Sequence, residues 1–308
     1  MSLLCLGEAI VDLICPTALA RGDLDDLRGA RSFVPRLGGT MANVAVVAAR
    51  HGAAVSLAGA TADDPWGRWL RAALSEAGVG LDRFALAPGA ITTVAFVLVD
   101  EAGEPTYVVH GGAQSASLPE IADRLPAAVQ GCTALCVGSN TMVAEPEREL
   151  TLEARRQALE LGRPVIFDAN VRMHRWPGRG RVATVAGACV PDCLLVKANR
   201  LEAEILTGER DPARAADSLR AAGAQNVIVT LGAEGALLRG EVNAQVPAHP
   251  AQVRNTAGAG DVLLGVVLAR LVDAGFYPPA IAAALPAAVQ AAARATEAWG
   301  ATERPTAS

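Results

Sequence analysis

The stretch Asn255-Thr-Ala-Gly-Ala-Gly-Asp-Val-Leu-Leu-Gly265 places small, flexible residues directly before the apolar run 262–271. That run is too long and too regular for a loop, so we expect a buried helix. Its first turn would contain Gly258, Ala259, Gly260 and Asp261. The first N–H groups of a helix lack partners within it, and the helix dipole adds partial positive charge there. Because small residues let an outside group approach these amides, the stretch predicts an anion site, most naturally for phosphate.

Asp261 is unexpected in such a place, because a carboxylate repels an anionic ligand. A carboxylate that accepts the proton of an attacking hydroxyl would have a chemical reason to be there. The alternative is that Asp261 only complements the helix dipole and that the glycines only form a turn. Short glycine motifs match many unrelated sequences, so the rest of the chain has to decide.

The composition favours a folded protein with a large core. The 308 residues are 51% hydrophobic and 19% charged, with a net charge of −5, which is too apolar for a disordered chain. No run of Lys and Arg is present, so neither nucleic acid nor a membrane is expected as a partner. A small anionic ligand held by backbone amides remains compatible with this charge.

Cysteine and histidine usage argues against a zinc site. The six cysteines lack C-x-x-C spacing and the four histidines are scattered, so buried reduced thiols are expected. No apolar run reaches the ~18 residues that span a bilayer. The first 16 residues lack a basic segment and carry Glu8 and Asp12, which is not typical of a signal peptide. The sequence therefore predicts a cytoplasmic protein.

Strand and helix patterns alternate along most of the chain. We expect strands at 3–14, 54–60, 134–138, 164–168, 193–197 and 227–231, and helices at 40–50, 64–78, 145–161, 199–206, 211–222 and from 258 and 278. Such alternation is typical of an α/β protein with a mostly parallel sheet and helices on both faces. The segments 92–99 and 105–110 predict a hairpin flap, and 235–239 with 242–247 a second, short hairpin.

Polar residues gather where these strands should end, which is the edge where α/β sheets bind ligands. The set is Asp12; Gly38, Gly39 and Asn43; Asp168, Asn170 and Arg172; Lys197, Asn199 and Glu202; and Thr230, Gly232 and Gly235. Each residue alone has an ordinary structural explanation as a helix cap, a turn or, for Asn43, a solvent-facing helical position. Their common edge is harder to explain without a ligand. P-loop and Rossmann glycine motifs are absent.

Four motifs in order carry a resemblance to a known family: GGTMANVA (38–45), NRLEAEILTG (199–208), VTLGAEGA (229–236) and NTAGAGD (255–261). Over nearly the whole chain the sequence resembles the ribokinase-like, or PfkB, carbohydrate kinases. The run FDANVRMHRW (167–176) is similar to the branch of fructokinases and 2-keto-3-deoxygluconate kinases. The resemblance implies a three-layer α/β sandwich, one domain over 1–308, with a discontinuous β lid from about 12–37 and 92–110.

The resemblance also implies roles for single residues. It implies transfer of the ATP γ-phosphate to a sugar hydroxyl, with Asp261 as base and the amides of Gly258, Ala259 and Gly260 as the anion hole. Asp12, Gly38, Gly39, Asn43, Asn170 and Arg172 would bind the sugar. Asn199 and Glu202 would organise Mg²⁺ and phosphate through water, with Glu202 nearest the metal, while Thr230, Gly232 and Gly235 line the nucleotide. A homodimer through the lid is also implied.

Several positions depart from the family pattern. Asn255 stands where an Asp usually helps to hold an activating K⁺, so a K⁺ site is doubtful. Leu263, Ala169 and Ala198 also differ from the usual residues. His110 stands near the place of a frequent lid Arg, which favours a neutral ketose such as fructose over an acid sugar. The alternatives are a 2-keto-3-deoxygluconate kinase, a nucleoside kinase of the same fold, and a binding protein without catalysis.

Overall fold

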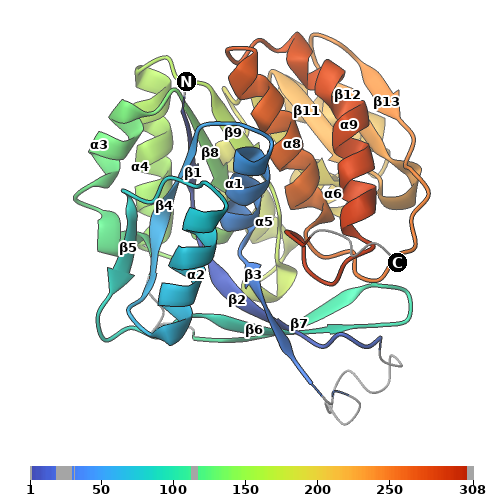
Figure 1. The fold of residues 1–308 in the computed structure, drawn as a ribbon. Helices are drawn as coiled ribbons and strands as arrows, with labels where there is room; N and C mark the ends of the chain where they lie inside the picture. Colours follow the sequence, from blue (N-terminus) through green and yellow to red (C-terminus); the bar gives the residue numbers. More distant parts are fainter. Residues whose placement is uncertain (1, 19–29, 31, 112–116, 304–308) are drawn as a thin grey trace.

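A computed structural model describes residues 2–18, 30, 32–111 and 117–303 of the chain. Its larger sheet has nine strands in the order β13-β12-β11-β10-β9-β8-β1-β4-β5 (Figure 1). They span β1 (Leu3–Leu6), β4 (Val55–Ala62), β5 (Phe84–Ala87), β8 (Ala134–Gly138), β9 (Val165–Asp168), β10 (Leu195–Asn199), β11 (Asn226–Thr230), β12 (Ala236–Arg239) and β13 (Ala244–Val246). All neighbours pair in parallel except at β12, which is antiparallel to both β11 and β13.

Helices cover both faces of this sheet, as the alternating pattern predicts. One face packs against α1 (Thr40–Arg50), α2 (Pro65–Glu76), α8 (Ala259–Asp273) and α9 (Pro279–Ala295). The other packs against α3 (Leu125–Gly131), α4 (Glu147–Glu160), α5 (Arg179–Val185), α6 (Arg200–Thr207) and α7 (Pro212–Ala221). The expected three-layer α/β sandwich is therefore confirmed.

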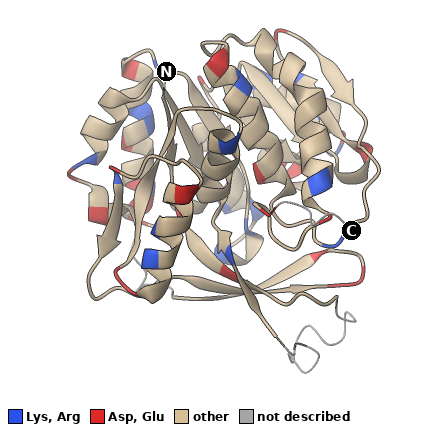
Figure 2. Ribbon diagram, in the orientation of Figure 1, with Lys and Arg blue, Asp and Glu red and all other residues tan. Residues whose placement is uncertain are grey.

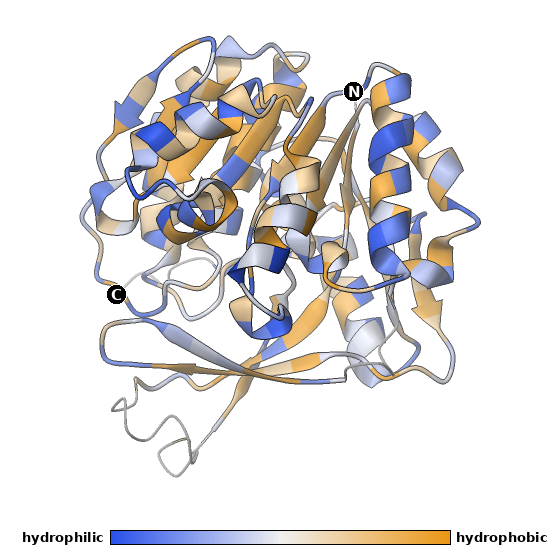
Figure 3. Ribbon diagram, turned by 180° about the vertical axis from the view of Figure 1, so that it is seen from behind, coloured by the Kyte–Doolittle hydropathy of each residue, from blue (hydrophilic) through white to orange (hydrophobic). Residues whose placement is uncertain are grey.

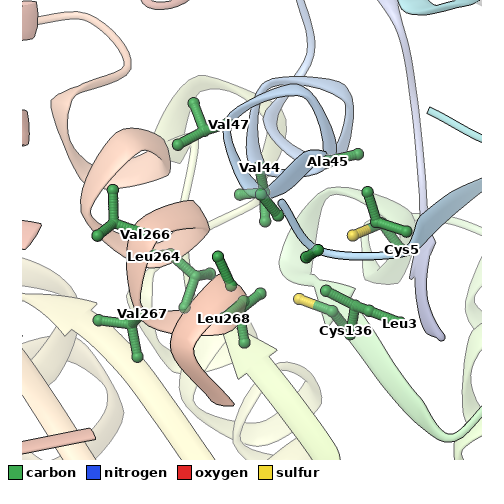
Figure 4. Close-up of a cluster of buried hydrophobic side chains, with 14 of the residues drawn as sticks. Leu3, Cys5, Val44, Ala45, Val47, Cys136, Leu264, Val266, Val267 and Leu268 are labelled. Atoms are coloured by element: carbon green, nitrogen blue, oxygen red, sulfur yellow. The ribbon is translucent and has the colours of Figure 1, made fainter. Parts of the chain in front are cut away.

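Alternation along each strand divides the core between the two layers. In β1, Leu3 and Cys5 join the cluster that contains α1 and α8, whereas Leu4 and Leu6 join the cluster on the opposite face. Figure 4 shows the α1–α8 side of this core, and Figure 3 shows apolar strands between helices with hydrophilic outer faces. Burial on both faces explains why these strands read as continuous apolar runs.

Helix α8 is buried along most of its length. It is apolar nearly all round because α1 and α9 pack on it, and Gly265 allows a close approach to α1. A Cβ at Gly265 would come within 2.6 Å of Val47 Cβ. The first turn of α8 is thereby fixed against the core.

A second sheet of four strands, the lid sheet, lies across the carboxyl ends of the main strands (Figure 1). Its order is β3-β2-β6-β7, with β2 (Ile10–Ile14), β3 (Val34–Gly38), β6 (Val94–Val99) and β7 (Pro105–His110). The expected hairpin is β6–β7, which is antiparallel. Residues 19–29 and 31 of the expected lid lie outside the described residues.

The prediction of one strand over 3–14 is wrong, because the chain changes sheets after Leu6. Gly7 packs against α1, where a Cβ would come within 2.6 Å of Met41 Cγ. Asp12 therefore lies within lid strand β2 rather than after a central strand. Strand β3 was not expected because Pro35 interrupts its pattern, and proline is tolerated there because β3 is an edge strand. The short elements β5, α3 and α5 were not expected either.

Local sequence features also match the structure. Asp64 caps α2, accepting the Gly67 N–H at 2.8 Å, with Pro65 at the first helical position as predicted. The six cysteines are buried and free. Basic and acidic residues are interspersed along the helices (Figure 2). Among the described residues, no helix is long and apolar enough to cross a membrane.

Candidate active site

The first turn of α8 has the conformation that an anion site needs. Gly258 is the N-cap residue with φ 77°, followed by Ala259 and Gly260 as the first two helical residues. A Cβ on Gly258 would overlap Ala301, so only glycine fits there. No side chain caps this helix within the described part of the chain. The Ala259 N–H donates to the Thr256 carbonyl at 3.3 Å, a long hydrogen bond that a ligand would have to compete with.

Asp261 is the third residue of this helix and is 3% exposed. Its carboxylate accepts two side-chain amide hydrogen bonds, from Asn43 Nδ2 of α1 at 2.9 Å and from Asn170 Nδ2 after β9 at 3.0 Å. Asn43 is therefore buried against the site and does not face solvent. Asn170 adopts φ 28°, a conformation that asparagine tolerates better than most residues. The carbonyl oxygens of both side-chain amides have no hydrogen-bond partner in the described structure.

The surroundings of Asp261 raise its pKa to about 7. Burial is the main cause and the negative charge of Asp168 adds to it. Lys197, the Asn43 hydrogen bond and Arg172 act in the opposite direction. Asp261 is thus a carboxylate poised to exchange a proton near neutral pH.

Asp12 approaches the same place from the lid. A Cβ on Gly38 would overlap the Asp12 carboxyl group, so the predicted Gly38 and Asp12 do lie together. Asp12 Oδ1 is buried without a partner among the described residues. Burial raises the pKa of Asp12 to about 7; Arg172 lowers it and Asp261 raises it further. The neighbouring Gly39 has φ 95° at the start of α1.

Arg172 of the main body contacts Tyr107 of lid strand β7. The Arg172 guanidinium lies 5.5 Å from the centroid of the Tyr107 ring. Burial opposes its charge, but Tyr107, Asp261, Glu202 and Asp168 together raise the pKa of Arg172. Tyr107 is a site residue that sequence reasoning missed, since only strand register reveals which lid residues face the main body.

Strand register also shows on which face of the lid sheet His110 lies. Asp12 pairs with Ala95 in β6, and Tyr107 pairs with Val97, so these residues share one face of the lid. His110 is three residues from Tyr107 and lies on the other face, edge-on to Phe96 at 5.5 Å between ring centroids. The comparison of His110 with a family Arg therefore carries no information about the sugar.

A second group of predicted residues lies at the ends of β10 and β11. Asn199 and Glu202 form a capping box: Asn199 Oδ1 accepts the Glu202 N–H at 2.9 Å, and Glu202 Oε2 accepts the Asn199 N–H at 2.7 Å. Glu202 Oε1 accepts the Val171 N–H at 2.8 Å, which joins this group to Asn170 and Arg172. Burial raises the pKa of Glu202, against an opposing effect of Lys197.

Thr230 lies beside Asn199 in the β10–β11 register, and Gly232 and Gly235 follow it. Both glycines have positive φ, 60° and 97°. A Cβ on Gly235 would overlap the Val246 carbonyl, so the turn requires glycine. The predicted nucleotide residues thus form one patch next to the Asn199 cap, at the same sheet edge as Asp261.

Asp168 and Lys197 lie between these two groups; the sequence placed both at strand ends but assigned neither a role in the site. They are neighbours in the β9–β10 register, and Lys197 Nζ donates to Asp168 Oδ1 at 3.1 Å. The available signal was a charged residue closing each of two apolar strands. Glu8 was also missed: its Oε1 accepts from Thr40 N at 3.2 Å and from Asn140 Nδ2 at 2.9 Å, holding the start of α1.

The residues present fit the two implied metal ions differently. Glu202 already accepts a backbone N–H at each oxygen, so it suits contact with metal-bound water better than direct ligation. Asn255 Nδ2 donates to the Trp299 carbonyl at 2.6 Å and its Oδ1 accepts the Ala257 N–H at 2.9 Å. A donor aimed at a carbonyl does not fit a K⁺ site, which needs only acceptors.

Comparison with known proteins adds independent findings. The family model described as pfkB family carbohydrate kinase matches residues 1–307. Fructokinase-1 of Oryza sativa subsp. japonica is 30% identical over 87% of this chain and 82% of its own length. Aminoimidazole riboside kinase of Salmonella typhimurium is 32% identical over 90% of this chain and 83% of its own length.

Solved structures agree with these relatives. A fructokinase from Vibrio cholerae O395, bound to fructose, ADP and potassium ion, has a TM-score of 0.83 at 27% identity, covering 99% of this chain and 94% of its own. The Salmonella enterica aminoimidazole riboside kinase, bound to aminoimidazole riboside and an ATP analog, has a TM-score of 0.80 at 28% identity, covering 99% and 97%.

Proposed function

This chain belongs to the pfkB family of carbohydrate kinases, and from that premise we propose that it transfers the γ-phosphoryl group of ATP to a hydroxyl of a neutral ketose such as fructose. As a member of this family it is a phosphotransferase with a hydroxyl acceptor. The observation that carries the assignment is the buried Asp261 carboxyl group, whose pKa is raised to about 7, at the first turn of α8.

The reaction would use the two halves of the site together. The sugar hydroxyl loses its proton to the Asp261 carboxylate as its oxygen bonds to the γ-phosphorus, and the bond from that phosphorus to the bridging oxygen of ADP breaks. The amides of Gly258, Ala259 and Gly260 would stabilise the negative phosphoryl oxygens. Thr230, Gly232 and Gly235 would line the nucleotide beside the Asn199 cap. Mg²⁺ bound to the phosphates would neutralise their charge, with Glu202 holding its water.

Unpaired buried acceptors support a polyhydroxylated substrate. Asp12 Oδ1, Asn43 Oδ1 and Asn170 Oδ1 have no partners in the described structure, and sugar hydroxyls are the natural donors to such oxygens. Gly38 leaves room for the Asp12 carboxyl group and Gly39 for the Glu8 carbonyl oxygen, so these glycines would support Asp12 in its position toward the sugar. The lid sheet, which contributes Asp12 and Tyr107, would exclude water from the reaction.

Charge supports a neutral sugar. The described cluster contains the carboxyl groups of Asp12, Asp168, Glu202 and Asp261 but only two cations, Lys197 and Arg172. Lys197 forms an ion pair with Asp168, which leaves Arg172 facing several carboxyl groups. An acid sugar would add another negative charge to this excess. We therefore place fructose before 2-keto-3-deoxygluconate.

Aminoimidazole riboside is a second candidate because the Salmonella kinase for it matches this chain as closely as the fructokinases do. The test is kcat/KM for fructose, aminoimidazole riboside and 2-keto-3-deoxygluconate at saturating MgATP, with ADP release and sugar phosphate both measured. We expect fructose to give the highest value. A clear preference for the riboside would replace fructose, whereas binding without any phosphorylated product would indicate a non-catalytic protein.

A further inference from the structure

The buried pair of Lys197 and Asp168 is unexplained by the reaction as described so far. Their residues are 3% and 0% exposed, and the Nζ–Oδ1 distance is 3.1 Å. Removing two charges from water is costly, so such a pair is weak evidence for stability, and an apolar pair often serves as well. Asp168 Oδ2 has no partner in the described structure, so even the carboxylate is incompletely satisfied. A pair of this kind calls for a reason beyond folding.

Its position provides one, because the ammonium group lies directly against the catalytic turn. A Cβ on Gly260 would come within 2.6 Å of Lys197 Nζ, so the absence of a side chain at this residue makes room for the charge. Asp168 fixes the ammonium from the side of β9. The backbone amide of Gly260 is one of those expected to receive the phosphoryl group.

The positive charge of Lys197 is also unusual for this place. A cation near the N-terminus of a helix is normally unfavourable, because the helix dipole is already positive there. The groups facing this place are Asp168 from β9, Lys197 from β10, Glu202 from α6, Asn43 from α1, Arg172 from the loop after β9, Asp12 from the lid and Asp261 itself. A positive charge added beside the amides of this first turn strengthens the attraction for an anion, which is what a phosphoryl group in transfer requires.

We propose that Lys197 is a positioning residue for phosphoryl transfer, which supports the turn at Gly260 and adds a fixed positive charge behind the amides of the anion hole. Asp168 holds the ammonium in place and does not itself touch the substrate. This inference rests on the proposed function of the site.

The experiment separates this role from mere charge balance. Lys197→Met leaves Asp168 buried without its partner, so it should lower both stability and kcat. The double variant Asp168→Asn with Lys197→Met replaces the pair by neutral groups of similar size. We expect it to recover thermal stability but to keep kcat about tenfold or more below wild type, with KM for sugar and MgATP within about threefold. Recovery of stability together with wild-type kcat would overturn the inference.

Two further variants keep the result interpretable. Asn226→Ala removes a buried polar group at the opposite end of β11, where Asn226 Nδ2 donates to Leu194 O, and should lower stability without changing kcat. If the double variant does not fold, Gly260→Ala displaces the ammonium from the turn while both charges remain. It should lower kcat with KM nearly unchanged, and wild-type kcat in this variant would contradict the role.

A binding measurement distinguishes failure of this inference from failure of the proposed function. Thermal stabilisation by inorganic phosphate should be at least about threefold smaller in the double variant than in wild type and Asn226→Ala. This readout does not require the chain to phosphorylate any sugar. An inactive wild type with this difference would overturn the kinase assignment alone, whereas equal stabilisation would overturn the role of Lys197.

Discussion

At the residue scale, Asp261 owes its chemistry to burial rather than to its own side chain. The same aspartate at an exposed first turn would only complement the helix dipole. Here the Asn43 and Asn170 amides orient both carboxylate oxygens, and burial with Asp168 nearby raises the pKa to about 7. A base with this pKa is well matched to proton abstraction near neutral pH.

The pH dependence of the rate follows from this pKa. The base must be ionised, so kcat/KM should rise with pH and level off above about 7, with Asp12 titrating in the same range. In Asp168→Asn the acid limb should move to lower pH, because a charge that raises the Asp261 pKa is removed while Lys197 remains. A pH–rate profile measured with fructose checks both statements. An acid limb near pH 4 would contradict them.

Stability should depend on pH through the same group. The folded-state pKa of Asp261 is raised above 3.8, so its protonated form stabilises the fold, and this stability is lost as pH rises through about 7. Asp261→Asn should therefore raise Tm at pH 8 and raise it by less at pH 5, where only part of the interval between the unfolded and folded pKa values has been crossed. The new amide can donate to Asn170 Oδ1 if the Asn170 side chain flips. A lower Tm at pH 8 in this variant would contradict the sign.

At the element scale, the site residues lie at the ends of strands and helices. Some of them both stabilise an element and are expected to bind a ligand. The Glu202 carboxylate both completes the capping box of α6 and ties the loop at Val171. Glu202, which we expect near a metal-bound water, therefore also links the end of β10 to the loop after β9.

Glu202→Gln should show both duties at once. The amide can accept only one of the two backbone N–H groups, so we expect a loss of about 1–3 kcal/mol of unfolding free energy together with a higher Mg²⁺ concentration for half-maximal rate. Glu204→Gln is the matched control, because Glu204 pairs with Arg179 at the surface and should change neither value appreciably. An unchanged Mg²⁺ profile would remove Glu202 from the metal site.

Asn255 makes a similar connection between the loop before α8 and the end of the chain. Its side-chain amide bridges the Ala257 N–H and the Trp299 carbonyl. We expect wild-type activity and Tm to be the same in KCl and in choline chloride. Asn255→Asp places a carboxylate oxygen against the Trp299 carbonyl, so this variant should be less stable in choline and recover in KCl. Strong K⁺ activation of wild type would show that a cation site exists despite Asn255.

At the scale of the whole molecule, the lid sheet is linked to the body at points far from one another in sequence. Thr256 N donates to the Gly103 carbonyl in the β6–β7 turn at 2.8 Å, and Arg36 of β3 pairs with Glu303. Trp299 packs against buried apolar residues of β2 and β6. Val108 is 43% exposed on lid strand β7. A homodimer through the lid stays a prediction.

Much of this architecture could be predicted because buried parallel strands and amphipathic helices leave strong local patterns. Local patterns could not show that the chain changes sheets after Leu6, where Gly7 packs closely against Met41 of α1, because this contact is with a residue distant in sequence. The site residues divide in the same way, into those that a local motif predicts and those that depend on distant contacts. Asp261 and the glycines have a local motif, whereas Tyr107, Lys197 and the orientation of His110 depend on strand register and on partners distant in sequence.

The central claim is that Asp261 takes the proton from the sugar hydroxyl. The most direct measurement is kcat for Asp261→Asn with fructose and MgATP, beside KM for both substrates and a thermal melt. The account predicts a folded protein with KM values close to wild type and kcat lower by about 10²–10⁴-fold. A folded variant with near-normal kcat would contradict the account and leave Asp261 as a residue that only complements the helix dipole.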